Sequence, residues 1–294
     1  MTSERTEFLK TFDGTDLFFR CFAPRGRGNL EGLVLAVHGF AEHSGRYAEV
    51  AEAVCAKGLA FACFDLRGHG KSGPRRGDAE NLHAMILDVL FVTNHARSIL
   101  ALSKPGDRDL FFGLLGHSFG ALLVTYAAHI LHDTCPPLFL SSPLYRVKQP
   151  VPQWKKLAVR ALPRVSPLVP VPIGIAPENI SRNPENNAAY VADELNLTTI
   201  TARFGELFLA SVDERNIAAS AAGIKAPVTV CYGAKDTLVD TAATQTVFPL
   251  FPSRHKRIAP IAEGGHEIFN EVLAVRAEAI AELVRWVEAR GIPG

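Results

Sequence analysis

Short apolar segments alternate with longer amphipathic segments along most of this chain. Apolar runs of strand length lie at residues 33–37, 60–64, 110–115, 228–231 and 256–261. Segments with helical periodicity lie at residues 46–56, 82–102, 121–131 and 271–289, with a shorter one from residue 241. Apolar strands that alternate with helices are typical of a parallel sheet buried on both faces. The pattern therefore predicts an α/β fold with a mostly parallel central sheet and helices on both sides of it.

The N-terminal residues show a different pattern. Residues 7–12 and 16–22 predict two strands, and the dipeptide Asp13-Gly14 between them is a typical hairpin turn. We therefore expect an antiparallel hairpin ahead of the alternating strands and helices.

The alternation also stops between residues 142 and 226, for about 80 residues, which is too long for a loop in a compact domain. We therefore expect an insertion at residues 143–222 that separates two parts of one core, residues 1–142 and 223–294. The insertion divides into a proline-rich half, residues 143–177, and a helical half, residues 186–222.

The pentapeptide Gly116-His117-Ser118-Phe119-Gly120 stands between an apolar run and a helical segment. A G-x-S-x-G sequence in this position is typical of a nucleophile elbow, in which the glycines let strand and helix approach closely and expose the serine hydroxyl. The alternative is a glycine-rich turn with an ordinary serine, because so short a pattern also occurs by chance. Its place between strand and helix favours Ser118 as a nucleophile.

A serine hydroxyl becomes nucleophilic when a base removes its proton and a third group orients that base. His266 lies between the last predicted strand and the final helix, where α/β enzymes of this topology present a base. Asp236 follows the preceding strand, at the carboxyl edge of the sheet where Ser118 also emerges. Asp240 is the alternative acid, but it immediately precedes a predicted helix and is expected to cap it. For His266 the alternative is a surface or helix-capping histidine.

The tetrahedral intermediate of acyl transfer needs hydrogen-bond donors for its negatively charged oxygen. One expected donor is the backbone N–H of Phe119, which follows the nucleophile. The other is the backbone N–H of Phe40, in the loop after the strand that ends at Val37; a ring that packs against the pocket wall is compatible with this role. His117 is interpreted as structural or pocket-lining, and residues 65–72 as a hydrogen-bonded loop that braces the Phe40 loop.

Composition narrows the range of functions. The formal net charge is +1 over 294 residues, of which 48% are apolar, so the chain can bury a large core but has no global field to attract nucleic acid. The first residues carry charges where a secretory signal would be apolar, and no uninterrupted apolar run approaches the length of a membrane span. The five scattered cysteines contain no C-x-x-C pair and predict reduced thiols. We expect a cytoplasmic protein without a nucleic-acid role.

Together, these motifs resemble those of serine α/β-hydrolases of the monoacylglycerol lipase and lysophospholipase type. The resemblance rests on residues 38–47, 65–72, 116–120, 233–236 and 265–271. It implies an α/β-hydrolase fold, a catalytic triad of Ser118, Asp236 and His266, oxyanion donors at Phe40 and Phe119, and no metal or cofactor. Phe119 stands where methionine is usual and Phe40 where a small residue is common, which leaves the size of the substrate open.

Family members carry a cap over the site at the position of the insertion. Here the proline-rich half contains six basic residues and no acidic one. On a helical wheel of residues 154–164, apolar and basic side chains occupy opposite faces, with Trp154, Leu157, Ala158, Ala161 and Leu162 on one and Lys155, Lys156, Arg160 and Arg164 on the other. Such a helix suits an anionic membrane surface. The alternative is that its apolar face closes over the core.

We therefore expect a serine esterase that hydrolyses single-acyl lipid esters, a monoacylglycerol or a lysophospholipid, through an acyl-enzyme. A carboxylesterase, thioesterase or peptidase with the same triad is the alternative, because a fold does not fix its substrate. A non-catalytic ligand receptor is disfavoured by the intact motifs. The expected partners are the lipid substrate and, through the cap, a membrane surface, with no required protein partner.

Overall fold

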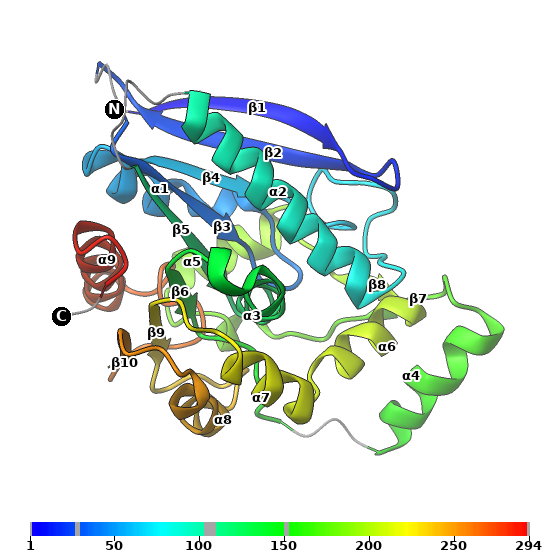
Figure 1. Cartoon of the computed structure of the whole chain (residues 1–294). Helices are drawn as coiled ribbons and strands as arrows, with labels where there is room; N and C mark the ends of the chain where they lie inside the picture. The colour runs from blue at the N-terminus through cyan, green and yellow to red at the C-terminus, as the bar shows by residue number, and fades with distance from the viewer. Residues whose placement is uncertain (1, 27–29, 103–109, 150–152, 293–294) are drawn as a thin grey trace.

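Eight strands form one sheet at the centre of the molecule (Figure 1). The computed structural model describes residues 2–26, 30–102, 110–149 and 153–292, without the side chains of residues 153–156 and 158. The strands are β1 (Thr2–Lys10), β2 (Asp16–Pro24), β4 (Ala60–Phe64), β3 (Gly32–Val37), β5 (Phe111–His117), β6 (Leu138–Ser141), β9 (Val228–Gly233) and β10 (Lys256–Ile261), in spatial order. The pairs β1–β2 and β2–β4 are antiparallel and the other pairs are parallel. The predicted mostly parallel sheet is confirmed.

Helices cover both faces of the sheet. One face carries α1 (Ala48–Ala56) and α9 (Leu273–Glu288); the other carries α2 (Leu82–Leu102), α3 (Phe119–Leu131) and α8 (Thr241–Val247). Every residue of β3, β4 and β9 is buried, which explains why these strands are continuously apolar rather than alternating. Helix α3 is buried at every position from Phe119 to Ala128. Helix α9 turns one apolar stripe inward, which includes Trp286, whose ring meets those of Phe111 and Phe139.

The long helix α2 was predicted with its observed bounds. Its length and composition alone would allow residues Leu82–Ala101 to cross a membrane, but half of that stretch is buried inside this fold. Its Asp88 is fully buried and accepts two hydrogen bonds from Arg67, at 2.6 and 2.8 Å. An ion pair of this kind places α2 in the core of a globular fold.

The predicted N-terminal hairpin is present, with different strand bounds. β1 begins at Thr2 and ends at Lys10, so Phe12 lies in the turn instead of the strand. The turn is closed by Asp13, whose carboxylate accepts hydrogen bonds from Thr11 Oγ1 at 2.6 Å and from the Thr15 N–H at 3.1 Å. β1 is an edge strand with mostly exposed residues, and for this reason its first half carries no apolar signal.

Residues 143–222, called the cap from here on, form elements outside the main sheet. They are α4 (Gln153–Val165), β7 (Pro170–Pro172), α5 (Pro184–Ala192), β8 (Thr199–Thr201), α6 (Ala202–Ser211) and α7 (Glu214–Ala222). β7 and β8 pair as a separate antiparallel two-stranded sheet, and α4 packs on α6 away from the main sheet (Figure 1). Short 3₁₀ turns lie at Ser44–Tyr47, His132–Thr134, Pro177–Asn179 and Phe248–Leu250. The domain boundaries as such stay a prediction.

Candidate active site

Ser118 occupies the sharp turn between β5 and α3. Its backbone has φ 52° and ψ −117°, a conformation that residues other than glycine rarely adopt. The flanking glycines make this turn possible: a Cβ on Gly120 would lie 2.2 Å from the Val37 carbonyl oxygen, and one on Gly116 would lie 2.6 Å from Ala121 Cα. The turn has the geometry of a nucleophile elbow, and its serine lines a cavity of the protein.

A chain of hydrogen bonds joins Ser118, His266 and Asp236. His266 Nε2 lies 2.9 Å from Ser118 Oγ, and His266 Nδ1 lies 2.7 Å from Asp236 Oδ2. The other carboxylate oxygen of Asp236 accepts the backbone N–H groups of Leu238 and Val239, at 2.8 and 2.9 Å. Backbone N–H groups therefore hold one carboxylate oxygen of Asp236, and the other oxygen faces the imidazole.

The electrostatics of this pair favour a charged imidazole. Burial by itself would lower the pKa of His266, but the Asp236 carboxylate, together with the carboxyl groups of Glu267 and Glu42, outweighs burial and raises it. Burial likewise acts to raise the pKa of Asp236, and His266 together with the two backbone N–H donors brings it below its ordinary value. An imidazolium that forms during a reaction is therefore stabilised where it forms.

Asp240, the alternative acid, lies outside this chain of hydrogen bonds. Its Oδ1 accepts the Ala242 N–H at 3.0 Å and caps α8, and its Oδ2 accepts from Arg146 at 3.1 Å. His117, next to the nucleophile, lines the cavity and has Nδ1 3.0 Å from Ser141 Oγ. Asp240 therefore caps helix α8 and His117 lines the cavity, as predicted.

The two candidate oxyanion donors come from the residue after the nucleophile and from the loop after β3. Phe119 is the first residue of α3, so its N–H belongs to the helix turn that lacks intrahelical acceptors. Phe40 belongs to residues 38–47, called the oxyanion loop from here on, and lines the cavity with Ser118. The loop at 65–72 braces it as expected, because the Leu66 N–H donates to His38 Nε2 and the Ser44 N–H donates to Asp65, both at 2.8 Å.

The cavity in front of Ser118 has a volume of about 710 Å³ and two chemically different linings. Cap residues provide most of its apolar lining: Val159, Val171, Ile173, Ile175, Ile200 and Phe208. Its acidic and other polar lining comes from Glu42, His117, Gln149, Tyr190 and Glu267, together with Ser118 and His266. A cavity with such a lining fits an acyl chain joined to a hydroxylated group.

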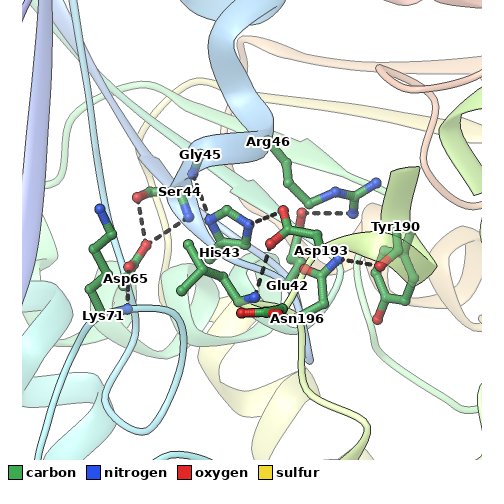
Figure 2. Close-up of polar contacts among 12 residues, drawn as sticks. Glu42, His43, Ser44, Gly45, Arg46, Asp65, Lys71, Tyr190, Asp193 and Asn196 are labelled. Atoms are coloured by element: carbon green, nitrogen blue, oxygen red, sulfur yellow. Dashed lines mark hydrogen bonds and ion pairs between the residues drawn. The ribbon is translucent and has the colours of Figure 1, made fainter. Parts of the chain in front are cut away.

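A buried charge cluster, which the sequence motifs did not reveal, lies in the polar lining. Arg46 donates to both oxygens of Glu267, at 2.5 and 2.8 Å. It also donates to Glu42 at 3.3 Å, a contact drawn in Figure 2. Its guanidinium also lies over the Tyr190 ring, 4.8 Å from the centroid. Burial and the nearby Glu267 carboxylate raise the pKa of Glu42 to about 7. The only sequence signals were the i, i+4 spacing of Glu42 and Arg46 and the place of Glu267 beside His266.

Four phenylalanine rings form a wall next to Ser118. The Phe40 centroid lies 4.3 Å from that of Phe208, 5.4 Å from that of Phe204 and 5.9 Å from that of Phe119. Phe40 and Phe119 are the two residues that depart from the family pattern, whereas Phe204 and Phe208 belong to α6 of the cap. The large residue at position 40 therefore contacts the cap directly.

Among the described residues, no group of three or more His, Cys, Asp or Glu side chains is arranged to bind a metal ion.

Comparisons with known proteins agree with this geometry. The profile of the Hydrolase_4 family, described as serine aminopeptidase, S33, matches residues 28–272. Monoacylglycerol lipase of Mycolicibacterium smegmatis is 29% identical over 82% of each chain, and human monoglyceride lipase is 28% identical over 96% of this chain and 90% of its own length. The crystal structure of Paleococcus ferrophilus monoacylglycerol lipase superposes with a TM-score of 0.79 at 26% identity, covering 93% of this chain and 99% of that one. The chain belongs to the Hydrolase_4 family and is a serine hydrolase with the α/β-hydrolase fold of the monoacylglycerol lipase type.

Proposed function

We propose that this protein hydrolyses monoacylglycerols, or closely similar neutral single-acyl esters, through an acyl-enzyme on Ser118. The observation that carries the proposal is the Ser118–His266–Asp236 chain of hydrogen bonds at the wall of a cavity with an apolar and a polar lining. The similarity to monoacylglycerol lipases along most of the chain supports the same substrate class.

In the proposed reaction, His266 Nε2 takes the proton from Ser118 Oγ as the oxygen attacks the ester carbonyl. The developing oxyanion accepts hydrogen bonds from the backbone N–H groups of Phe40 and Phe119. His266 then gives the proton to the departing alcohol, and a water molecule activated by the same imidazole releases the fatty acid. Asp236 holds the imidazole in the tautomer that both steps need, with the proton on Nδ1.

The charge cluster favours a neutral alcohol over a phosphate-bearing one. The guanidinium of Arg46 is already bound by the carboxylates of Glu42 and Glu267, so it is not available to pair with a phosphate. With Glu267 bound to Arg46 and the pKa of Glu42 raised to about 7, the cluster has no net positive charge to attract an anionic group. Carboxyl oxygens, by contrast, accept hydrogen bonds from hydroxyl groups. Of the two lipid classes that the sequence left open, this arrangement favours monoacylglycerol over lysophospholipid.

A panel of esters with one common acyl chain tests this proposal. We expect purified protein to hydrolyse monoacylglycerol at least tenfold faster, in kcat/KM, than lysophosphatidylglycerol, with fatty-acid release as the measurement. A series of p-nitrophenyl esters of increasing chain length is the matched control, since it measures the acyl lining alone. Equal rates on both lipids would contradict the head-group argument, and no turnover of any ester would contradict the proposed function.

We further propose a cytoplasmic location with peripheral membrane contact through α4. All five cysteines are free, which suits a reducing compartment. Leu157, Ala161 and Val165 are exposed, Leu157 to 66% and Val165 to 87%, so this part of the predicted apolar face does not close over the core. Arg160 and Arg164 are exposed beside them, while Trp154, Lys155 and Lys156 lie outside the described side chains. Exposed apolar and basic residues on one helix are typical of membrane-surface binding.

The membrane contact is testable by charge removal. Replacing Lys155, Lys156, Arg160 and Arg164 with glutamine is expected to weaken sedimentation with anionic vesicles by about 1 kcal/mol per charge, and wild-type binding is expected to fall with added salt. Hydrolysis of p-nitrophenyl acetate should change little. The control replaces four exposed basic residues outside the cap, Arg5, Arg25, Lys225 and Arg254. Wild-type protein that fails to sediment at low salt, or a control that loses as much binding, would contradict the proposal.

A further inference from the structure

The oxyanion loop holds a residue in an unfavourable backbone conformation. Ala41, next to Phe40, has φ 66°, in the left-handed region that residues with a Cβ rarely adopt. Such a conformation persists only where the surroundings impose it. The core supplies one constraint, because the Gly39 N–H donates to Glu42 Oε1 at 2.6 Å. This hydrogen bond does not involve the Ala41 carbonyl, whose partners lie outside the loop.

The cap supplies the other constraints. The Leu197 N–H donates to the Ala41 carbonyl at 2.9 Å, and Tyr190 Oη donates to the same oxygen at 3.4 Å. Two residues further along the loop, His43 Nε2 lies 2.8 Å from Asp193 Oδ2, and Figure 2 shows this contact between the core loop and the end of α5. The loop that carries Phe40 is thus bonded on one side to the core and on the other to the cap.

The hydrogen bonds fix the tautomer of His43. Its Nδ1 accepts the Gly45 N–H at 3.1 Å, so Nδ1 carries no proton and Nε2 is the donor to Asp193. The imidazole is buried, with 5% of its side chain exposed, and therefore needs both partners. Asp193 is the acceptor that this buried donor requires.

Asp193 also shapes the segment that reaches Ala41. Its Oδ1 accepts the Leu195 N–H at 2.9 Å, and its carbonyl accepts the Asn196 N–H at 3.1 Å, which together form the turn after α5. This turn delivers the Leu197 N–H to the Ala41 carbonyl. One carboxylate therefore controls two of the contacts between this part of the cap and the oxyanion loop: it binds His43 with one oxygen and forms the turn that carries Leu197 with the other.

We propose that Asp193 is a positioning residue for ester hydrolysis, which acts through His43 and through the Leu197–Ala41 hydrogen bond to hold the Phe40 N–H where the oxyanion forms. The cap is then part of the catalytic apparatus as well as the wall of the acyl pocket. The inference rests on the proposed function, because it assumes that Phe40 donates to the oxyanion. A donor displaced by about 1 Å costs on the order of a hundredfold in rate, and loss of one oxyanion donor costs about 100- to 1,000-fold in kcat.

The variant Asp193→Asn tests the proposal. An amide has one acceptor oxygen, so it can accept from His43 or from Leu195 but not from both. We expect kcat for p-nitrophenyl butyrate to fall at least tenfold with little change in KM. The inhibition constant of a trifluoromethyl ketone, whose Ser118 adduct places an oxyanion in the same position, should rise by a similar factor. Glu194→Gln, one residue away and exposed, is the matched control, because it removes the same charge and keeps the turn.

Two further readouts separate positioning from general destabilisation. The apparent pKa of His266 in the pH profile of kcat/KM should be the same in both variants, because the His266–Asp236 pair is untouched. Asp193→Glu keeps two acceptor oxygens and should recover part of the kcat that Asp193→Asn loses. We expect this recovery even if Asp193→Asn lowers the thermal midpoint of unfolding. Equal kcat and equal ketone affinity in Asp193→Asn and Glu194→Gln would overturn the inference. Wild-type protein that hydrolyses no ester would instead overturn the proposed function.

Discussion

Replacing Ser118 with alanine is expected to reduce ester hydrolysis by about a millionfold, to the background rate, as is typical when an activated serine nucleophile is removed. The physical reason is that no other hydroxyl occupies the elbow, where Oγ meets His266 Nε2 at 2.9 Å. A fluorophosphonate probe should label the wild-type protein at one site and leave Ser118→Ala unlabelled, with intact-protein mass spectrometry as the measurement.

Two other serine hydroxyl groups close to the histidines of the site provide the control. Ser141 Oγ lies 3.0 Å from His117 Nδ1, and Ser142 Oγ donates to the His266 carbonyl at 2.8 Å, so neither hydroxyl is bonded to the His266 ring. Ser141→Ala should therefore keep stoichiometric labelling. A probe adduct mapped to Ser141 or Ser142 in the wild-type protein would contradict the assignment of Ser118.

Replacing Asp236 with asparagine is expected to lower kcat by about four orders of magnitude, as in triads of the same geometry. The structure gives the reason in this chain. Oδ1 of Asp236 is fixed by the N–H groups of Leu238 and Val239, so an asparagine would keep its oxygen there and turn its NH₂ group toward His266. The imidazole would then carry its proton on Nε2, facing Ser118, and could not accept the serine proton. Steady-state kinetics with a p-nitrophenyl ester measures the loss.

Asp240→Asn is the matched control for this prediction. Asparagine caps a helix as well as aspartate does, so α8 should retain its cap and kcat should stay within about twofold. Asp240→Ala should cost about 1 kcal/mol of stability with kcat unchanged, measured by urea unfolding. A larger kcat loss in Asp240→Asn than in Asp236→Asn would show that the acid has been misassigned.

Most of the core was predictable because each of its segments shows a single pattern of apolar residues, that of a buried strand or that of a helix. A strand buried on both faces must be apolar throughout, and β3, β4 and β5 were found for this reason. The hydrogen-bonded chain of three residues followed from the order of motifs along that core. By contrast, the short strands β7 and β8 contain prolines or polar residues and have no recognisable period. Their pairing depends on contacts within the cap that no local pattern encodes.

The polar contacts of the site were beyond the sequence for a different reason. Arg46 and Glu267 are 221 positions apart, and His43 and Asp193 are 150 positions apart. Each residue, taken alone, is an ordinary charged or polar side chain, and only the fold shows that the two partners of each pair lie together. The same limit applies to α4. Its amphipathic pattern was visible in the sequence, but the sequence did not show which face of the helix contacts the rest of the protein.

Parts of the cap differ in how they are attached. The segment from Ile180 to Thr201 binds the core directly, as in the bond from Thr201 Oγ1 to Asp78 at 2.6 Å and the one from the Glu267 N–H to the Ile180 carbonyl at 3.0 Å. Among the described residues, those from Val159 to Ile175 form hydrogen bonds only with other cap residues. We therefore expect local opening of α4 and β7 to require less free energy than unfolding of the whole chain. Such an opening is expected to expose the acyl pocket to a lipid while the segment that holds the oxyanion loop stays folded.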